Sequence, residues 1–202
     1  MSNSILAILV LATFTLYGQG TFIYDQQSSD ESNISGLISI QPYQPMGQSF
    51  TPGLSAIGFI RLALQDINPG NSLGAAVYVN LRTGSIGGSI LSSTDVVFMP
   101  DSFFGVTNFF LSSPILLTPG VTYYFQPVVQ SGDTWGTAAY NGYNYPGGTE
   151  FLSGSPFPNN DLWFREGIVV PEPGTWALLI LGCGLLAWRR CSTGRTTRRT
   201  SW

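Results

Sequence analysis

The chain of 202 residues contains no histidine and no lysine, and only 9% of its residues are charged. Without histidine there can be no Ser-His-Asp or Cys-His catalytic group and no histidine-ligated metal. Without lysine there can be no Schiff base and no Ser-Lys dyad. Acid–base chemistry could therefore use only carboxylates.

Cysteine is almost absent as well. Both cysteines, Cys183 and Cys191, lie near the C-terminus, so residues 21–170 hold no disulfide, no thiol nucleophile and no cysteine-ligated metal. A segment of about 150 residues buries enough apolar surface to fold without such cross-links. We expect residues 21–170 to form one domain.

The few charges are unevenly distributed. Residues 21–170 contain three arginines against ten aspartates and glutamates, a net charge of −7, whereas five of the eight arginines follow Trp188. Nucleic-acid binding requires cations that neutralise phosphates. We therefore expect no nucleic-acid partner for this acidic domain.

The C-terminal segment has three consecutive parts. Val-Pro-Glu-Pro-Gly occupies residues 170–174, an uncharged run of 13 residues extends from Trp176 to Trp188, and Arg189-Arg190 follow. The prolines disfavour helix at the start, and a helix over the run would cover about 20 Å of a hydrocarbon core about 30 Å thick. Arginines on one side predict that this side is cytoplasmic. The run therefore predicts a short transmembrane helix, with Trp176, Leu181 and Trp188 in the membrane.

Pro-Glu-Pro, a short hydrophobic span and an arginine cluster together resemble the PEP-CTERM sorting signal. The resemblance implies an exported bacterial protein that an exosortase, a membrane-embedded transpeptidase-like enzyme, processes at this tail. It also implies transient anchoring in the inner membrane of a Gram-negative bacterium, then residence at the cell surface or in the extracellular matrix. The sorting motif would comprise Val170, Pro171, Glu172, Pro173 and Gly174, with Arg189 and Arg190 on the cytoplasmic side.

The N-terminus agrees with export. Residues 5–16 are apolar and uncharged, which is the length of a signal-peptide core and too short for a comfortable membrane span. Gly18 and Gly20 are small residues around a cleavage position. We expect a signal peptide at residues 1–20, a domain at 21–170 and a sorting tail at 171–202.

Residues 21–170 show the pattern of short β-strands. Apolar stretches alternate with Gly, Pro, Asn and Ser, and Ala75, Val77, Val79 and Leu81 share one face of an extended segment. Candidate strands cover residues 21–24, 47–51, 57–64, 75–81, 95–99, 106–111, 121–129, 134–139 and 162–165. This spacing predicts an all-β fold, a two-sheet sandwich that resembles a jelly roll.

Aromatic residues gather in the last third of this domain. Trp135, Tyr140, Tyr143 and Tyr145 stand beside asparagines, and exposed aromatic faces next to amides suit sugar rings and hydroxyls. We expect these four residues to be candidates for carbohydrate binding. The alternative interpretation places Trp135, Trp163 and Phe164 in the hydrophobic core and packs the tyrosines against their own loop.

The carboxylates offer two further interpretations. Glu150, Asp161 and Glu166 are close in sequence, and a glycosidase needs two carboxylates that flank one bond. Asp25, Asp30 and Glu31, or Asp133 with backbone oxygens, could bind calcium, although no EF-hand spacing is present. Nothing in the sequence indicates that either set converges, so we expect no catalytic residue, no metal and no cofactor.

Two functions follow from the sequence. The first is a non-enzymatic surface or matrix protein associated with exopolysaccharide or biofilm, whose partners are the exosortase, the membrane before processing, and polysaccharide. The second is a secreted carbohydrate-active enzyme that uses paired carboxylates. A receptor domain that keeps its membrane anchor is a third alternative.

Overall fold

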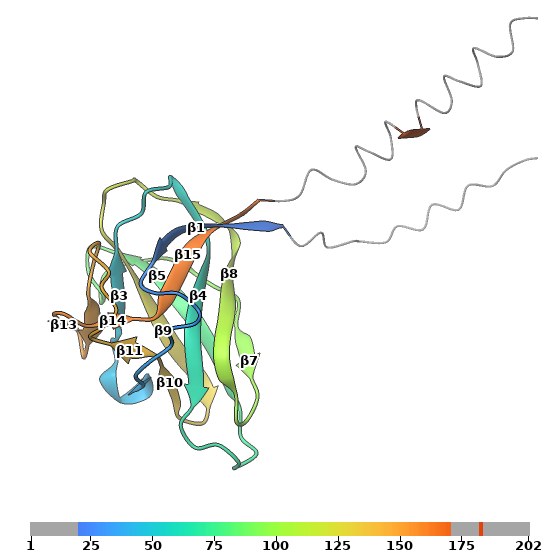
Figure 1. Cartoon of the computed structure of the whole chain (residues 1–202), viewed down its shortest axis with the longest axis vertical. Coiled ribbons are helices and arrows are strands. Elements are labelled where there is room, and N and C mark those ends of the chain that lie inside the picture. The colour runs from blue at the N-terminus through green and yellow to red at the C-terminus, as the bar shows by residue number, and fades with distance from the viewer. Residues whose placement is uncertain (1–19, 171–181, 184–202) are drawn as a thin grey trace, which may run out of the picture. The chain divides into compact units, whose positions relative to one another are not determined.

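A computed structural model of the chain describes residues 20–170 together with Gly182 and Cys183 (Figure 1). Several predictions concern residues outside this range. They are the signal peptide up to residue 19, the sorting motif after Val170, and the membrane and arginine residues Trp176, Leu181, Trp188, Arg189 and Arg190. Gly182 and Cys183 are helical, and Cys183 is exposed. No helix within the described part of the chain is long and apolar enough to cross a membrane.

Antiparallel β-strands make up the unit that extends from Phe22 to Val170, which confirms the predicted all-β class. One large sheet has the order β1–β15–β4–β10–β2, with β8 paired to β4. Its strands are β1 (Thr21–Gln27), β15 (Phe164–Val170), β4 (Ala56–Asp66), β10 (Trp135–Thr137), β2 (Ile38–Ser39) and β8 (Phe104–Leu116).

A second large sheet has the order β13–β12–β3–β9–β5–β6, with β7 paired to β5. Its strands are β13 (Ser155–Phe157), β12 (Glu150–Leu152), β3 (Gly47–Phe50), β9 (Tyr123–Gly132), β5 (Ala75–Thr83), β6 (Ile90–Ser93) and β7 (Val97–Met99). The short strands β11 (Ala139–Tyr140) and β14 (Asp161–Leu162) pair with each other near β13 (Figure 1). A 3-10 turn, η1 (Gln41–Tyr43), precedes β3.

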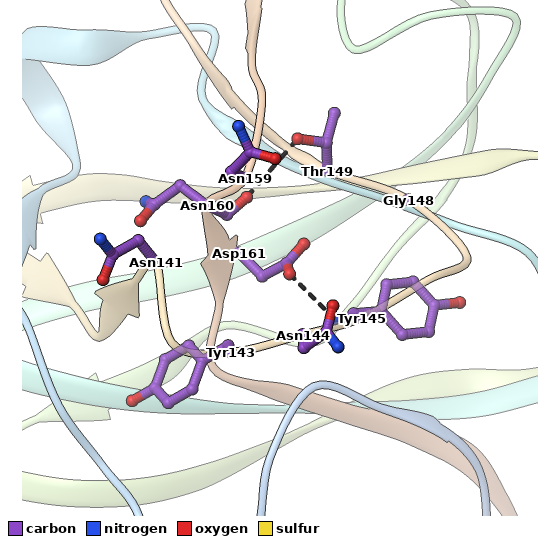
Figure 2. Close-up of a pocket in the computed structure, with 9 residues that line it drawn as sticks. All are labelled: Asn141, Tyr143, Asn144, Tyr145, Gly148, Thr149, Asn159, Asn160 and Asp161. Carbon is purple, nitrogen blue, oxygen red and sulfur yellow. Dashed lines mark hydrogen bonds between the residues drawn. The ribbon is translucent and has the colours of Figure 1, made fainter.

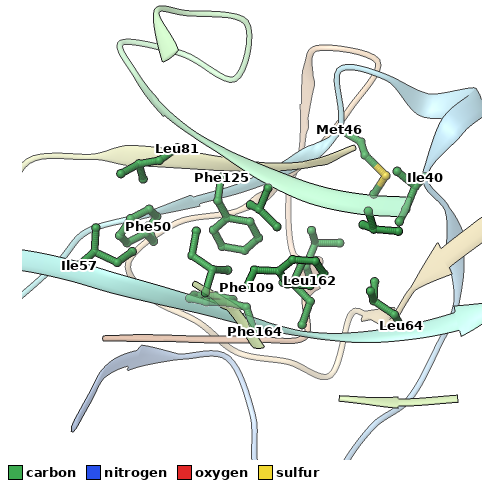
Figure 3. Close-up of a cluster of buried hydrophobic side chains, with 14 of the residues drawn as sticks. Ile40, Met46, Phe50, Ile57, Leu64, Leu81, Phe109, Phe125, Leu162 and Phe164 are labelled. Carbon is green, nitrogen blue, oxygen red and sulfur yellow. The ribbon is translucent and has the colours of Figure 1, made fainter. Parts of the chain in front are cut away.

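Both large sheets contribute to one hydrophobic core, so the arrangement is sandwich-like. The alternating residues Ala75, Val77, Val79 and Leu81 of β5 are all buried, as their spacing predicts. Phe125 of β9 contacts Phe164 of β15 across the core, with ring centroids 5.1 Å apart. Figure 3 shows this apolar cluster between the strands of the two sheets.

The predicted strands match the long elements better than the short ones. Strands β4, β5, β8 and β9 all overlap a predicted segment, and each extends beyond it at one end or both. Val121, predicted to begin a strand, is exposed and precedes β9, because the turn after Pro119 and Gly120 continues through it. The sequence did not predict β2, β6, β12 or β13, which have two to four residues each.

Truncation of the Phe125 side chain in the core is expected to destabilise the domain strongly. Phe125 has 0% exposure and contacts both Phe50 and Phe164. Phe125→Ala should lower the free energy of unfolding by about 3–5 kcal/mol because it leaves a cavity between the sheets. Urea unfolding followed by near-UV circular dichroism measures this loss. Phe104→Ala, at a ring that is 66% exposed, is the matched control and should change it by less than about 0.5 kcal/mol; equal losses would contradict the described core.

Candidate functional site

Two adjoining pockets lie where the loop after β11 meets the segment from β13 to β14. The first, which we call the Asp161 pocket, has a volume of about 310 Å³, within the range of roughly 300–1,000 Å³ typical of small-molecule sites. Figure 2 shows the lining residues, which come from the two segments 141–149 and 159–161, with Asp161 near the centre of the view. Its lining residues are Asn141, Tyr143, Asn144, Tyr145, Gly148, Thr149, Asn159, Asn160 and Asp161.

The second pocket, which we call the Tyr140 pocket, has a volume of about 420 Å³. It shares Asn141, Asn159 and Asn160 with the Asp161 pocket, so the two pockets adjoin, and we call them together the depression. Its lining residues are Ala139, Tyr140, Asn141, Phe157, Pro158, Asn159 and Asn160. None of the residues that line either pocket is an arginine, and Asp161 is the only acidic one.

Local turn chemistry places the two walls. Strands β12 and β13 form a hairpin whose two loop residues, Ser153 and Gly154, both have positive φ (50° and 81°), as a tight hairpin turn requires. The hairpin delivers Phe157 to the rim. Asn159 also adopts a left-handed conformation, with φ of 64°, which asparagine tolerates better than most residues. The chain then enters β14, where Asp161 pairs with Tyr140 of β11.

A buried hydrogen-bond network holds this region onto the second sheet. Gln48 of β3 donates from Nε2 to Asp161 Oδ1 at 2.7 Å, and its Oε1 accepts the Leu162 N–H at 3.0 Å. The other oxygen of Asp161 accepts the backbone N–H of Tyr145 at 3.0 Å. Gln48 has 0% exposure and Asp161 5%, so loss of any partner in this network would leave a buried polar group without a hydrogen bond.

The asparagine side chains that face solvent are free to bind a ligand. Within residues 20–170, no hydrogen bond involves the side-chain amides of Asn141, Asn144 or Asn159, and all three residues are exposed. Asn160 differs, because its Nδ2 donates to the buried Glu150 carboxyl. The free amides each offer a donor and an acceptor, which is the pairing that sugar hydroxyls need.

Three of the four predicted carbohydrate-binding aromatics are buried. Trp135 has 0% exposure, Tyr143 2% and Tyr145 6%, so none offers a ring face to a ligand. Trp135 belongs to the core, as the alternative interpretation placed it, and Trp163 and Phe164 are buried as well. Figure 2 shows the rings of Tyr143 and Tyr145 directed away from the asparagine side chains.

The tyrosines are buried because each hydroxyl has partners inside the domain. The Tyr143 hydroxyl donates to the Ser35 carbonyl at 2.9 Å and accepts the Ser35 N–H at 2.5 Å. The Tyr145 hydroxyl accepts the Thr51 N–H at 3.1 Å and donates to Gln26 Oε1 at 3.2 Å. Burial raises the pKa of Tyr145 to about 12, so this hydroxyl keeps the proton that it donates. A loop composition alone does not reveal such partners.

Tyr140 is the predicted aromatic residue that stays available, with 44% exposure. Its ring packs edge-on against Tyr143 at a centroid distance of 5.6 Å and lies over Gly142, where a Cβ atom would approach within 2.2 Å of the ring. Phe157, which the sequence analysis missed, lines the same pocket and is 50% exposed. The pattern that could have predicted its exposure is its position between Pro156 and Pro158, in a segment rich in turn-forming residues.

Of the three carboxylates considered for catalysis, Asp161 lines the Asp161 pocket, and Glu150, which does not line it, is bonded to the lining residue Asn160. Burial raises the pKa of both, and the charge of Asp161 adds to the increase that brings Glu150 to about 7. Glu150 has 0% exposure, and both oxygens of Asp161 accept internal hydrogen bonds. Glu150 Oε1 is buried without a hydrogen-bond partner among the described residues, whereas the oxygens of Asp161 hold Gln48 and the Tyr145 backbone in place.

Glu166 on β15 has a different environment. It has 0% exposure, and neither of its carboxyl oxygens has a hydrogen-bond partner among the described residues. Burial, followed by the negative charge of Asp25, raises the pKa of Glu166 to about 9. Asp25 Oδ2 accepts the N–H groups of Gly53 and Leu54 at 2.7 and 2.8 Å. Glu166 is therefore a neutral, buried carboxylic acid at pH 7.

The acidic residues considered for calcium have other partners. Asp30 and Glu31 form ion pairs with Arg165 at 3.2 and 3.3 Å, and Glu31 also pairs with Arg61. Asp133 accepts hydrogen bonds from the side chains of Asn68 and Asn71. In the described part of the chain, no three His, Cys, Asp or Glu side chains are grouped so that they could hold a metal ion.

Comparison with known proteins adds no assignment. No protein-family model matches the chain, and no curated protein matches its sequence. The site must therefore be interpreted from its own geometry: free amides, two half-exposed rings and no cation among the residues that line it.

Because Glu166 is buried, we expect the free energy of unfolding of the domain to fall as the pH becomes alkaline. The pKa of Glu166 is raised from 4.5 to about 9 in the folded domain. The neutral form of Glu166 therefore stabilises the fold fully below about pH 4.5, and this stabilisation is lost as the pH rises to about 9. Glu150 contributes in the same direction up to about pH 7. Between pH 7 and pH 8 the free energy of unfolding should fall by about 1.4 kcal/mol, and the slope should decrease to about half of that value at pH 9.

Urea unfolding of the full chain across this pH interval tests the assignment. Glu166→Gln replaces the neutral acid with a neutral amide of similar shape and should remove most of the slope. Asp95→Asn, at an exposed carboxylate, is the control and should keep the wild-type slope. A Glu166→Gln slope equal to that of the wild type would show that another group titrates.

Proposed function

We propose that this chain is an exported, non-enzymatic protein of the bacterial cell surface or extracellular matrix that binds exopolysaccharide. In this proposal a signal peptide directs export, the tail anchors the chain transiently in the inner membrane, and an exosortase processes the PEP-CTERM signal. The two packed sheets form a jelly-roll-like β-sandwich that remains outside the cell. The sorting half of the proposal is supported by the order Pro-Glu-Pro, uncharged run and arginine cluster.

The binding half is supported by one observation, the depression formed by the two pockets. Asn141, Asn144 and Asn159 offer amide groups that no described residue uses, and Tyr140 and Phe157 offer half-exposed rings beside them. Polysaccharides present the matching surface, because each sugar ring has a polar edge of hydroxyls and an apolar face of C–H groups.

The second candidate function is a carbohydrate-active enzyme, which the proximity of Glu150 and Asp161 favours. A hydrolase would need one carboxyl to protonate the leaving oxygen and another to attack or to activate water. Glu150 is fully buried, and Asp161 uses both oxygens to hold Gln48 and Tyr145. Binding therefore agrees better than hydrolysis with the geometry.

Processing of the tail is tested in the producing bacterium. The double variant Pro171→Ala/Pro173→Ala should abolish processing, so the chain should keep residues 171–202 and accumulate in the inner membrane. Mass spectrometry of the C-terminal peptide, together with membrane fractionation, measures this. Thr175→Ser, just outside the motif, is the control and should be processed like the wild type. A wild-type chain that retains its tail would contradict the sorting proposal and support a permanently anchored receptor.

Binding is tested with the polysaccharide that the producing bacterium secretes. The full chain in mild detergent should co-sediment with this polymer, and Asn141→Ala/Asn144→Ala should weaken the association about tenfold because two amide contacts are lost. Gln130→Ala, at an exposed amide of β9 that lines neither pocket, is the control. Release of reducing ends that Glu150→Gln abolishes would instead support the enzyme.

A further inference from the structure

The chemistry of the depression distinguishes between classes of polysaccharide. Extracellular polymers are either uncharged or rich in carboxylates and sulfates, and an anionic polymer gains most of its affinity from cations on its partner. The available cations of the domain, the exposed rings and the free amides therefore decide which class fits. This step rests on the proposed binding function and concerns its ligand.

No arginine of the domain is available to an anionic sugar at the pockets. Among the described residues, Arg61 and Arg165 are held by Glu31, and Arg165 also pairs with Asp30. Arg82 donates to Gln126 Oε1 at 2.8 Å and to the Gly88 carbonyl at 2.5 Å. With a net charge of −7 over residues 21–170, the domain repels a polyanion and offers it no compensating ion pair.

The walls of the Tyr140 pocket suit an uncharged pyranose. Tyr140 and Phe157 come from two different strands, β11 and β13, and line the same pocket with 44% and 50% of their surface exposed. The contact with Tyr143 and the close packing over Gly142 restrict the Tyr140 ring, so little side-chain entropy is lost on binding. The apolar face of a sugar can pack on such a ring while its hydroxyls reach the amides.

The shared asparagines place the two pockets next to each other. Asn141, Asn159 and Asn160 line both pockets, which is the arrangement that consecutive sugar units of one chain require. In the Asp161 pocket the exposed amide of Asn144 adds a further donor and acceptor. Amides bind hydroxyls without requiring charge on the ligand.

We infer that the depression binds an uncharged polysaccharide, with one pyranose unit packed on Tyr140 and Phe157 and the next bonded to Asn141 and Asn144. The same residues discriminate against uronic-acid and sulfated polymers, because the domain is acidic and supplies no free cation at this place. Binding is correspondingly insensitive to salt, since no counterions are released.

Affinity electrophoresis of the full chain in mild detergent tests the inference. The uncharged probes are dextran, galactomannan and hydroxyethyl cellulose, and the anionic probes are alginate and polygalacturonate. We expect retardation by at least one uncharged polymer, unchanged at high salt, and none by the anionic ones. Tyr140→Ala and Phe157→Ala should each weaken the retardation about tenfold, and Phe104→Ala, at an exposed ring of β8, should leave it unchanged.

The remaining outcomes each contradict a specific step. Retardation by anionic polymers alone overturns the inference and leaves polysaccharide binding intact. Retardation by uncharged polymers that neither Tyr140→Ala nor Phe157→Ala weakens overturns the location of the site. Binding to the host polysaccharide with no retardation by any uncharged probe also overturns the inference. Absence of binding to the host polysaccharide and to every probe overturns the proposed function itself.

Discussion

The buried hydrogen bond between Gln48 and Asp161 is the constraint on which the candidate site depends. It joins a strand in the second large sheet to the segment that forms one wall of the pockets, and Asp161 extends the link to the Tyr145 backbone. Because these groups are buried, loss of Asp161 would leave a side-chain amide and a backbone N–H unpaired, at a cost of about 1–3 kcal/mol each. Asp161 thus holds the wall of the pocket in place, and in the proposed function its neighbours make the contacts with the ligand.

The loop after β11 obtains its rigidity from side chains, since it forms little regular structure. Tyr143 and Tyr145 flank the exposed Asn144, and each is inserted into the domain and held there by its hydroxyl. Asn144 is thereby presented to solvent on a fixed backbone. A fixed backbone lowers the entropy lost on binding, which matters for ligands that offer only weak individual contacts.

Sequence reasoning succeeded where burial follows a simple period. The alternation of Ala75, Val77, Val79 and Leu81 predicted β5 and its buried face, because one face of a strand must pack on the core. It failed for β12 and β13, which are three residues each and depend on a hairpin turn at Ser153 and Gly154. At the site, the sequence located the region but not the orientation of Tyr143 and Tyr145. Their burial depends on Ser35 and Thr51, about 100 residues earlier in the chain.

The formal charge of the domain overstates its negative charge at pH 7. Ten acidic residues and three arginines give residues 21–170 a net charge of −7. Glu166, with a pKa of about 9, is however mostly protonated at pH 7, and Glu150, with a pKa of about 7, is about half protonated. The hydrogen bonds that lower the pKa of Asp101 and Asp133 keep those exposed groups ionised. In the proposed function, amides and rings rather than Coulomb attraction therefore select the ligand of the depression.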